Sequence, residues 1–169
     1  ILPHLHDVRR HAPTVVDPCC GDGAILDVVA DAWGLARTIG IEINEARARS
    51  RMMVRRVVQR DALTPEQWAA PPIDFVLTNP PFALALEFVQ RALEEVREGG
   101  VVCFLLRLNW LASQKRATWM RANTPSVYVL PKRPSFTGKG TDATEYAWMV
   151  WRRDVEATVT ILDVETKGR

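Results

Sequence analysis

The residues best suited to chemistry are Asn79-Pro80-Pro81-Phe82, which follow an unbroken apolar run. The side-chain oxygen of Asn79 and the carbonyl of Pro80 can both accept hydrogen bonds from one planar NH2 group, and Phe82 can stack on the ring that carries it. The proline rings stiffen the loop, so the acceptors are fixed in advance. A purely structural alternative is that the prolines only end a strand, because they cannot donate to a ladder. The motif predicts a site that binds a conjugated amine.

A second chemically suggestive segment is Asp17-Pro18-Cys19-Cys20-Gly21-Asp22-Gly23. It lies between an apolar run and a stretch with helical spacing, and its glycines allow a tight turn and close approach of a ligand. A Gly-rich turn between a strand and a helix is typical of nucleotide binding in a Rossmann-like sheet. The dinucleotide pattern G-x-G-x-x-G is incomplete, because Leu26 stands at its third glycine position.

Two acidic residues follow later apolar runs. Glu42 comes near the end of the second predicted strand, where a carboxylate can accept hydrogen bonds from both ribose hydroxyls of a nucleotide. Alternatively, Glu42 caps a helix that starts at Asn44. Asp61 follows the third predicted strand and is suited to accept a hydrogen bond from an adenine amine.

The elements that must position these residues alternate between strands and helices. We expect strands at 14–17, 38–43, 57–59, 74–78, 101–106, 127–130 and 146–151, and an edge segment at 159–162. We expect a short helix or lead-in at 3–11 and helices at 24–32, from 44 onward, 83–98 and 110–123, with Gly99-Gly100 and Pro125 ending the last two. This order predicts an α/β fold with a doubly wound, mainly parallel sheet. The loop 131–143 contains no predicted helix, so the two strands that flank it should pair antiparallel.

Composition narrows the class of protein. The chain has 169 residues, 47% hydrophobic and 25% charged, which suits one globular domain spanning 1–169. No apolar run approaches the ~20 residues that span a bilayer, and no signal peptide is visible. The three cysteines lack metal-ligand spacing, which predicts no metal and a reducing compartment such as the cytoplasm.

Charge is distributed unevenly along the chain. The net charge is +2, yet Gly99 to Thr141 contains no Asp or Glu and seven Lys or Arg residues. A second basic run follows Asn44, with six arginines from Arg47 to Arg60. A single run of this kind is usually a solvated helix face, but a long acid-free stretch favours a polyphosphate partner.

Together these motifs resemble the class I S-adenosylmethionine-dependent methyltransferases, in particular DNA adenine-N6 methyltransferases of compact phage or prophage type. The resemblance runs from about Thr14 to Trp151. It implies S-adenosylmethionine as cofactor, duplex or single-stranded DNA as partner with the target base flipped out, and the cytoplasm of a prokaryotic cell. It implies catalytic roles for Asn79, Pro80, Pro81 and Phe82, and cofactor contacts from Asp17, Pro18, Cys19, Gly21, Gly23, Glu42, Asp61 and Asn79. It implies nucleic-acid contacts from Arg107, Asn109, Trp110, Lys115, Arg116, Lys132, Arg133, Phe136 and Lys139.

The chain departs from this family in two respects, and other acceptors remain open. Residues 1–13 show no Thr-Pro-like segment of the kind that helps to hold the methionine end of the cofactor, and we expect no separate target-recognition domain. Weak sequence specificity follows from the second departure. Similar motifs act on rRNA and tRNA bases, so RNA is an alternative. Phe82 in place of Tyr and the basic half disfavour a protein glutamine substrate, and the two intact loops disfavour an inactive subunit.

Overall fold

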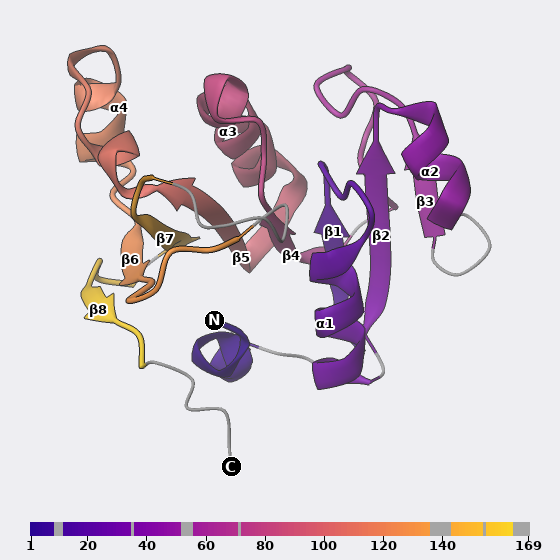
Figure 1. Ribbon diagram of the computed structural model, residues 1–169, viewed down its shortest axis with the longest axis horizontal. Helices are drawn as coiled ribbons and strands as arrows, with labels where there is room; N and C mark the ends of the chain where they lie inside the picture. Colours follow the sequence, from indigo (N-terminus) through magenta and orange to yellow (C-terminus); the bar gives the residue numbers. More distant parts are fainter. Residues whose placement is uncertain are drawn as a thin grey trace.

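The computed structural model describes residues 1–8, 12–34, 36–51, 56–70, 72–135, 143–153 and 155–163 (Figure 1). Its strands are β1 (Thr14–Asp17), β2 (Arg37–Glu42), β3 (Arg56–Gln59), β4 (Ile73–Thr78), β5 (Val96–Arg107), β6 (Ser126–Val129), β7 (Tyr146–Arg152) and β8 (Val159–Ile161). Its α-helices are α1 (Ala24–Trp33), α2 (Glu45–Arg51), α3 (Ala85–Glu95) and α4 (Ala117–Ala122). Short 3-10 helices occur at Leu2–Val8, Phe82–Leu84, Leu108–Leu111 and Gln114–Arg116.

The strands form one sheet in the order β3-β2-β1-β4-β5-β7-β6-β8. Strands β1 to β5 pair in parallel, whereas β7 pairs antiparallel with both β5 and β6. The predicted mainly parallel sheet and the antiparallel pair flanking the 131–143 loop are confirmed, and the edge segment is β8. The chain order reverses between β1 and β4, and this switch point leaves a crevice at the carboxyl ends of the strands.

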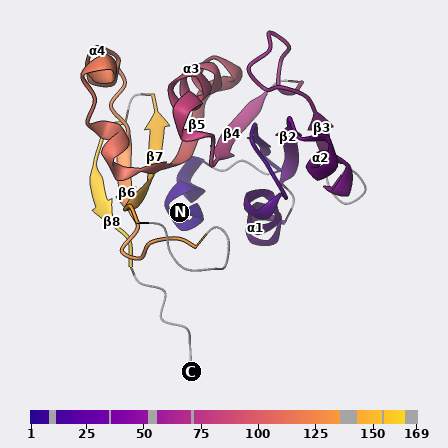
Figure 2. The same ribbon diagram turned by 45° about the horizontal axis from the view of Figure 1, so that its top comes forward.

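Helices cover both faces of the sheet, as Figures 1 and 2 show. One hydrophobic core joins the sheet to α3, with Phe88 and Val89 buried and α4 residues packed against it. The other joins the sheet to α1, α2 and the N-terminal 3-10 helix through Leu26, Ala48 and Leu5, respectively. Strand β4 is buried along its whole length, as its mainly apolar sequence predicts for a strand covered on both faces.

The predicted helix at 83–98 is shorter than expected, and the role assigned to Gly99-Gly100 was wrong. The α-helix ends at Glu95, and β5 begins at Val96. Its pairing with β4 shifts register between Ile73 and Phe75, so residues 97–100 form a bulge. A Cβ on Gly100 would clash with Val96 and lie 2.9 Å from the Asp74 carbonyl oxygen, and Gly99 has φ +68°. The glycines therefore permit a bend within a strand instead of ending a helix.

The predicted helix at 110–123 was also too long. Residues Leu108–Leu111 and Gln114–Arg116 form separate 3-10 turns, and only Ala117–Ala122 are α-helical. The aromatic side chains of Trp110 and Trp119 pack on Trp151, which bends this segment onto the sheet. Among the described residues no helix is long and apolar enough to cross a membrane, and no group of three metal-binding side chains occurs.

Candidate active site

The functional residues predicted from the sequence come together where the parallel strands end. Asp17 ends β1, Glu42 ends β2, and Asn79 directly follows β4. Two cavities open at this edge, one of about 640 Å³ and one of about 550 Å³. Both are lined by Cys19, Gly21, Arg47 and Asn79, so they meet at the loop after β1.

Asp17 anchors the loop after β1. Its side chain is 1% exposed, and Oδ1 accepts hydrogen bonds from the backbone N–H of Cys19 at 3.0 Å and the hydroxyl of Thr78 at 2.6 Å. Burial raises the pKa of Asp17 to about 7, the two hydrogen bonds lower it in part, and the negative charge of Glu42 raises it further. The Asp17–Thr78 contact ties β1 to β4 across the switch point.

The glycine loop is packed directly against β2. The backbone N–H of Cys20 donates to the carbonyl of Ile41 at 3.0 Å, and a Cβ on Gly40 would lie 2.6 Å from the Cys20 sulfur. Gly21 and Gly23 have φ +53° and +83°, in the region that favours glycine. Burial raises the pKa of Cys19, so its thiol stays neutral at physiological pH.

Glu42 is 7% exposed, and both of its oxygens are oriented by backbone donors. Oε2 accepts from the N–H of Gly21 at 2.8 Å, and Oε1 accepts from the N–H of Asn44 at 2.7 Å. The helix-start alternative is therefore correct in part, because Glu42 does bind the backbone just before α2. A carboxylate oxygen can accept more than one hydrogen bond, so Glu42 can also bind hydroxyl groups in the larger cavity that it lines.

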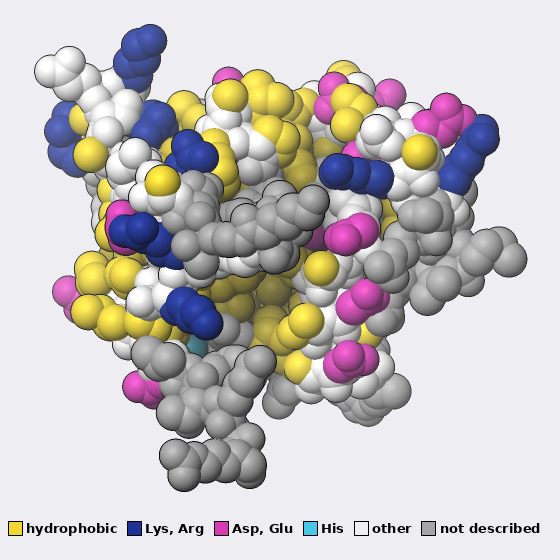
Figure 3. Space-filling model, in the orientation of Figure 1, with side chains coloured by type: hydrophobic (Ala, Val, Ile, Leu, Met, Phe, Trp, Pro, Cys, Tyr) yellow, Lys and Arg dark blue, Asp and Glu magenta, His cyan; other side chains and the backbone are white. Residues whose placement is uncertain are grey.

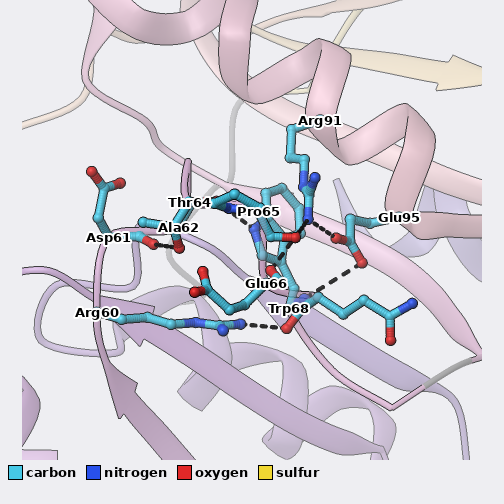
Figure 4. Close-up of polar contacts among 10 residues, drawn as sticks. Arg60, Asp61, Ala62, Thr64, Pro65, Glu66, Trp68, Arg91 and Glu95 are labelled. Carbon is cyan, nitrogen blue, oxygen red and sulfur yellow. Dashed lines mark hydrogen bonds and ion pairs between the residues drawn. The ribbon is translucent and has the colours of Figure 1, made fainter.

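Asp61 lies on the loop between β3 and β4, which a polar network attaches to α3 (Figure 4). Its Oδ1 accepts from the N–H of Leu63 at 2.9 Å, and its exposed carboxylate lines the larger cavity. Farther along the loop, the Trp68 indole donates to the carbonyl of Ala62 at 2.7 Å. Arg91 of α3 donates to the carbonyls of Pro65 and Glu66. These bonds fix the loop, and with it the position of Asp61.

Asn79 carries an unsatisfied oxygen where the two cavities meet. Its Oδ1 is buried and has no hydrogen-bond partner in the part of the chain that the structure describes. Asn79 lines both cavities, and Pro80 and Pro81 line the larger one. A buried acceptor without a donor costs about 1–3 kcal/mol, so it marks a position where a ligand donor is expected.

Phe82 is in contact with two side chains from neighbouring strands. The guanidinium of Arg107, at the end of β5, lies 4.8 Å from the centre of the Phe82 ring. The ring of Tyr146 lies 5.8 Å from the same ring. Arg107 and Tyr146 are directly paired across β5 and β7, and Arg107 Nε is 3.4 Å from the Tyr146 hydroxyl. A stacking surface of ring and guanidinium thus adjoins Asn79.

The predicted nucleic-acid residues fall into different environments. Trp110 is 6% exposed in an aromatic cluster, so its ring is not available to a base, and Arg116 lies over that ring and donates to the Trp110 carbonyl at 2.5 Å. Arg133 is exposed but paired with Glu145 at 2.7 Å. Asn109, Lys115 and Lys132 are exposed. Phe136 and Lys139 lie outside the described residues.

Charged side chains of opposite sign gather over different elements. Figure 3 shows Lys and Arg over the region of α4, and Asp and Glu over α1. The acid-free stretch of sequence therefore corresponds to a basic region on this face, on the β5-β7 side of the site.

Comparison with solved structures decides what this architecture is. A protein from Listeria monocytogenes described as a class I S-adenosylmethionine-dependent methyltransferase matches 95% of this chain and 62% of its own, with a TM-score of 0.69 and 14% identity. The chain adopts the class I methyltransferase fold. The same fold occurs in the 23S rRNA methyltransferase ErmE (TM-score 0.64, 21% identity, 88% of this chain and 64% of that one). A methyltransferase from Streptococcus mutans solved with SAH matches 89% of this chain and 97% of its own at 12% identity, with a TM-score of 0.56.

Sequence comparison finds a characterised relative for part of this methyltransferase-fold chain. The 4-amino-L-phenylalanine/4-methylamino-L-phenylalanine methyltransferase of Streptomyces pristinaespiralis is 39% identical over 82 residues, which is 44% of this chain. The match spans 28% of the length of that relative. No protein-family model matches the chain.

Several residues of this methyltransferase-fold site were not singled out by the sequence. Thr78, Gly40 and Tyr146 take part only through neighbouring strands, and nothing local to them signals it. Ile43 was read only as part of a strand, but its side chain is 64% exposed and lines the larger cavity. An apolar side chain directly after the strand-end acid is the signal that could have found it.

Proposed function

We propose that the protein transfers a methyl group from S-adenosylmethionine to the exocyclic amine of a planar conjugated ring, and that this ring is adenine in DNA. The observation that carries the proposal is the buried Oδ1 of Asn79, which has no partner among the described residues and lies at the junction of two cavities. The NH2 group of the ring to be methylated can donate a hydrogen bond to this oxygen and so satisfy it. The class I methyltransferase fold, shared with an S. mutans protein solved with SAH, supports the cofactor.

The larger cavity offers groups for each part of an adenosine. Glu42 can accept from the ribose hydroxyls, and Asp61 can accept from the adenine amine. Ile43 and Leu63 provide apolar walls for the purine ring. Gly21 leaves the backbone uncovered, Pro18 and Cys19 line the same cavity, and the N–H of Gly23 donates to the Cys20 carbonyl at 2.7 Å within the loop. These residues fit the cofactor by charge, polarity and shape.

The catalytic contribution of the chain lies in orienting an amine. When bound, S-adenosylmethionine supplies an electrophilic methyl group on a sulfonium. The lone pair of an exocyclic amine is delocalised into its ring, which makes it a poor nucleophile. If Asn79 Oδ1 and the Pro80 carbonyl accept hydrogen bonds from the two N–H groups of this amine, they favour a pyramidal nitrogen and stabilise its developing positive charge. Pro81 stiffens the loop, Phe82 stacks on the ring, and the methylated nitrogen can then lose a proton to water.

DNA as the methyl acceptor is supported by the basic region on the β5-β7 side of Asn79. Lys115 and Lys132 are exposed and can contact phosphates, whereas Arg133 is already paired with Glu145. A flipped base costs a few kcal/mol to extrude, and stacking on Phe82 returns roughly 1–3 kcal/mol. RNA remains the nearest alternative nucleic acid, since the chain shares its fold with an rRNA methyltransferase.

A second acceptor, a small arylamine, is favoured by the partial relative. That protein is named for methylation of 4-amino-L-phenylalanine, whose amine is conjugated to a benzene ring. The Asn79 and Phe82 arrangement suits an arylamine on the same physical grounds as adenine, because both present a planar NH2 group on a ring. The two acceptors differ in whether phosphate contacts are needed.

Tritiated methyl transfer separates these acceptors. Unmethylated duplex DNA, single-stranded DNA, rRNA and 4-amino-L-phenylalanine would be incubated with labelled S-adenosylmethionine, with the Asn79→Ala variant as control. We expect label in DNA, recovered as N6-methyladenine after digestion to nucleosides. Label only in the amino acid would contradict the DNA proposal and support the arylamine. Label in none of the four would contradict both.

We further propose that sequence specificity on DNA is weak. Phosphate contacts from exposed lysines such as Lys132 carry no direct sequence information, and reading base edges needs groove contacts from well-placed side chains. Adenines should therefore be methylated in many contexts. Long-read mapping of methylated plasmid DNA tests this, and a single motif of four or more defined bases would contradict it.

A further inference from the structure

The smaller cavity has a distinctive charge pattern. Asp17 and Asp22 line it, and Arg47 is the only positively charged residue among the described residues that do so. Arg47 also lines the larger cavity, so it stands where the two cavities meet. Its Nη1 lies 3.9 Å from the position that a Cβ on Gly21 would take, directly over the loop after β1.

We propose that Arg47 binds the carboxylate at the amino-acid end of S-adenosylmethionine. This inference rests on the proposed function, because it concerns the same cofactor. The amino-acid end carries an ammonium group and a carboxylate. Asp17 and Asp22 can attract the ammonium, but the carboxylate needs a donor, and the described lining of the cavity offers one cationic side chain for it.

The backbone of the loop is poorly placed to bind this anion instead. The N–H of Cys19 donates to Asp17, that of Cys20 to the Ile41 carbonyl, and that of Gly21 to Glu42. The N–H of Gly23 donates to the Cys20 carbonyl at 2.7 Å. Because these four donors are already engaged within the protein, a side chain is better placed than they are to supply the counter-charge.

The start of α2 fixes the backbone position of Arg47 relative to Glu42, the carboxylate proposed to bind the ribose. Glu42 Oε1 accepts from the N–H of Asn44, and Asn44 Oδ1 accepts from the N–H of Arg47 at 3.1 Å. This short chain of bonds fixes the backbone of Arg47 relative to Glu42. The planar guanidinium can present two parallel N–H donors to a carboxylate, which a lysine cannot do.

Arg49 provides a matched control on the same helix. It is also exposed, it forms an ion pair with Glu45 one turn earlier, and it lines neither cavity. Removing its charge changes the net charge of the protein and of α2 as much as removing that of Arg47. A general electrostatic effect on a charged ligand would therefore appear in both variants.

Calorimetry with two ligands tests the proposal. S-adenosylhomocysteine carries the carboxylate, and its decarboxylated analogue S-adenosyl-3-thiopropylamine retains the adenosine and the ammonium. We expect Arg47→Gln to weaken S-adenosylhomocysteine binding about tenfold and to leave the analogue unchanged, the scale of losing one charge-assisted hydrogen bond at an exposed position. Arg47→Lys should weaken S-adenosylhomocysteine binding less than Arg47→Gln does. Arg49→Gln should bind both ligands like the wild type.

Each other outcome has a distinct meaning. If Arg47→Gln weakens both ligands equally, Arg47 only supports the loop, and the proposal is wrong. If it weakens neither, the carboxylate is bound elsewhere, and the proposal is again wrong while the cofactor assignment stands. Failure of the wild type to bind either ligand would overturn the proposed function together with this inference. Should Arg47→Gln not fold, Arg47→Lys keeps the test, with an expected loss of about threefold for S-adenosylhomocysteine alone.

Discussion

The region at the ends of β1, β2 and β3 and the region after β4 differ in how far their side-chain oxygens are already satisfied. In the first region Asp17, Glu42 and Asp61 each accept a backbone N–H. In the second, Asn79 Oδ1 is buried and has no partner among the described residues.

This difference matches the two kinds of ligand that the proposed reaction requires. An invariant cofactor can be met by carboxylates and glycines fixed in advance, which lowers the entropy cost of binding. The region after β4, where the proposed methyl acceptor would bind, instead keeps the buried Asn79 oxygen, which only a hydrogen-bond donor satisfies. This favours amines over groups without N–H bonds. The comparison predicts that changes in the first region impair cofactor binding and changes in the second impair methyl transfer.

The largest expected effect is on cofactor binding and comes from Gly21→Val. A side chain here would cover the loop where the cofactor must approach, and φ +53° disfavours any β-branched residue. We expect no detectable S-adenosylmethionine binding by calorimetry. Gly34→Val is a suitable control, since Gly34 also has positive φ, at +43°, but no described heavy atom lies within 4 Å of the position that its Cβ would take. Unchanged affinity in the Gly21 variant would contradict the assignment of this loop.

Asn79→Ala should lower the rate of methyl transfer without weakening cofactor binding, which would distinguish the two regions. Loss of one preorganised polar contact should lower the methylation rate by about 10²-fold or more, with S-adenosylmethionine affinity nearly unchanged. Asn79→Asp keeps an oxygen acceptor and should retain more activity than Ala. The measurements are single-turnover methyl transfer and calorimetry on the same preparations. Activity within a few-fold of the wild type in the Ala variant would show that Asn79 is not catalytic.

A smaller effect concerns the pH dependence of stability. Burial raises the pKa of Asp17 from its ordinary 3.8 to about 7, so the folded protein keeps a proton that the unfolded chain has lost between these values. The free energy of unfolding should therefore fall as pH rises from about 4 to about 7, and change little from this source above pH 7. Asp17→Asn should flatten this slope in urea titrations of ligand-free protein, whereas the exposed Asp31→Asn should not. An unchanged slope in Asp17→Asn would contradict the raised pKa.

The smallest expected effect is on DNA binding and comes from changes at the basic surface that includes Lys132 and Arg133. Lys132→Gln should weaken DNA binding a few-fold and reduce the slope of log affinity against log salt by about 1, because one phosphate contact is lost. Arg133→Gln should have less effect, since Arg133 is paired with Glu145 at 2.7 Å. Fluorescence anisotropy with a short duplex over a range of salt concentrations measures both. Equal slopes in the wild type and both variants would show that DNA does not contact this loop.

The sequence alone predicted most strands of the sheet and the edge at which the candidate site lies. Short, mainly apolar runs such as Thr14–Asp17 and the fully buried Ile73–Thr78 can be recognised locally, because a strand covered on both faces is largely apolar. Loop residues that follow these runs necessarily meet at one edge of a parallel sheet. Asp17, Glu42 and Asn79 could therefore be assigned to one crevice without coordinates.

The tertiary structure decided where local signals were ambiguous. Gly99-Gly100 fits both a helix end and a bulge, and the close approach of Val96 and the Asp74 carbonyl to Gly100 requires the bulge. Trp110 fits both a nucleic-acid contact and a core residue, and its packing on Trp119 and Trp151 places it in the core.

Contacts between distant residues were likewise beyond the sequence. Asp17 and Thr78 are 61 positions apart, and Phe82 meets Arg107 and Tyr146 only because β5 and β7 pair in a particular register. Arg47 belongs to a run of arginines that looks uniform in the sequence, yet it lines both cavities whereas Arg49 lines neither. Which charge of such a run faces a ligand depends on how the helix packs against the loop beside it, and that is a property of the folded chain alone.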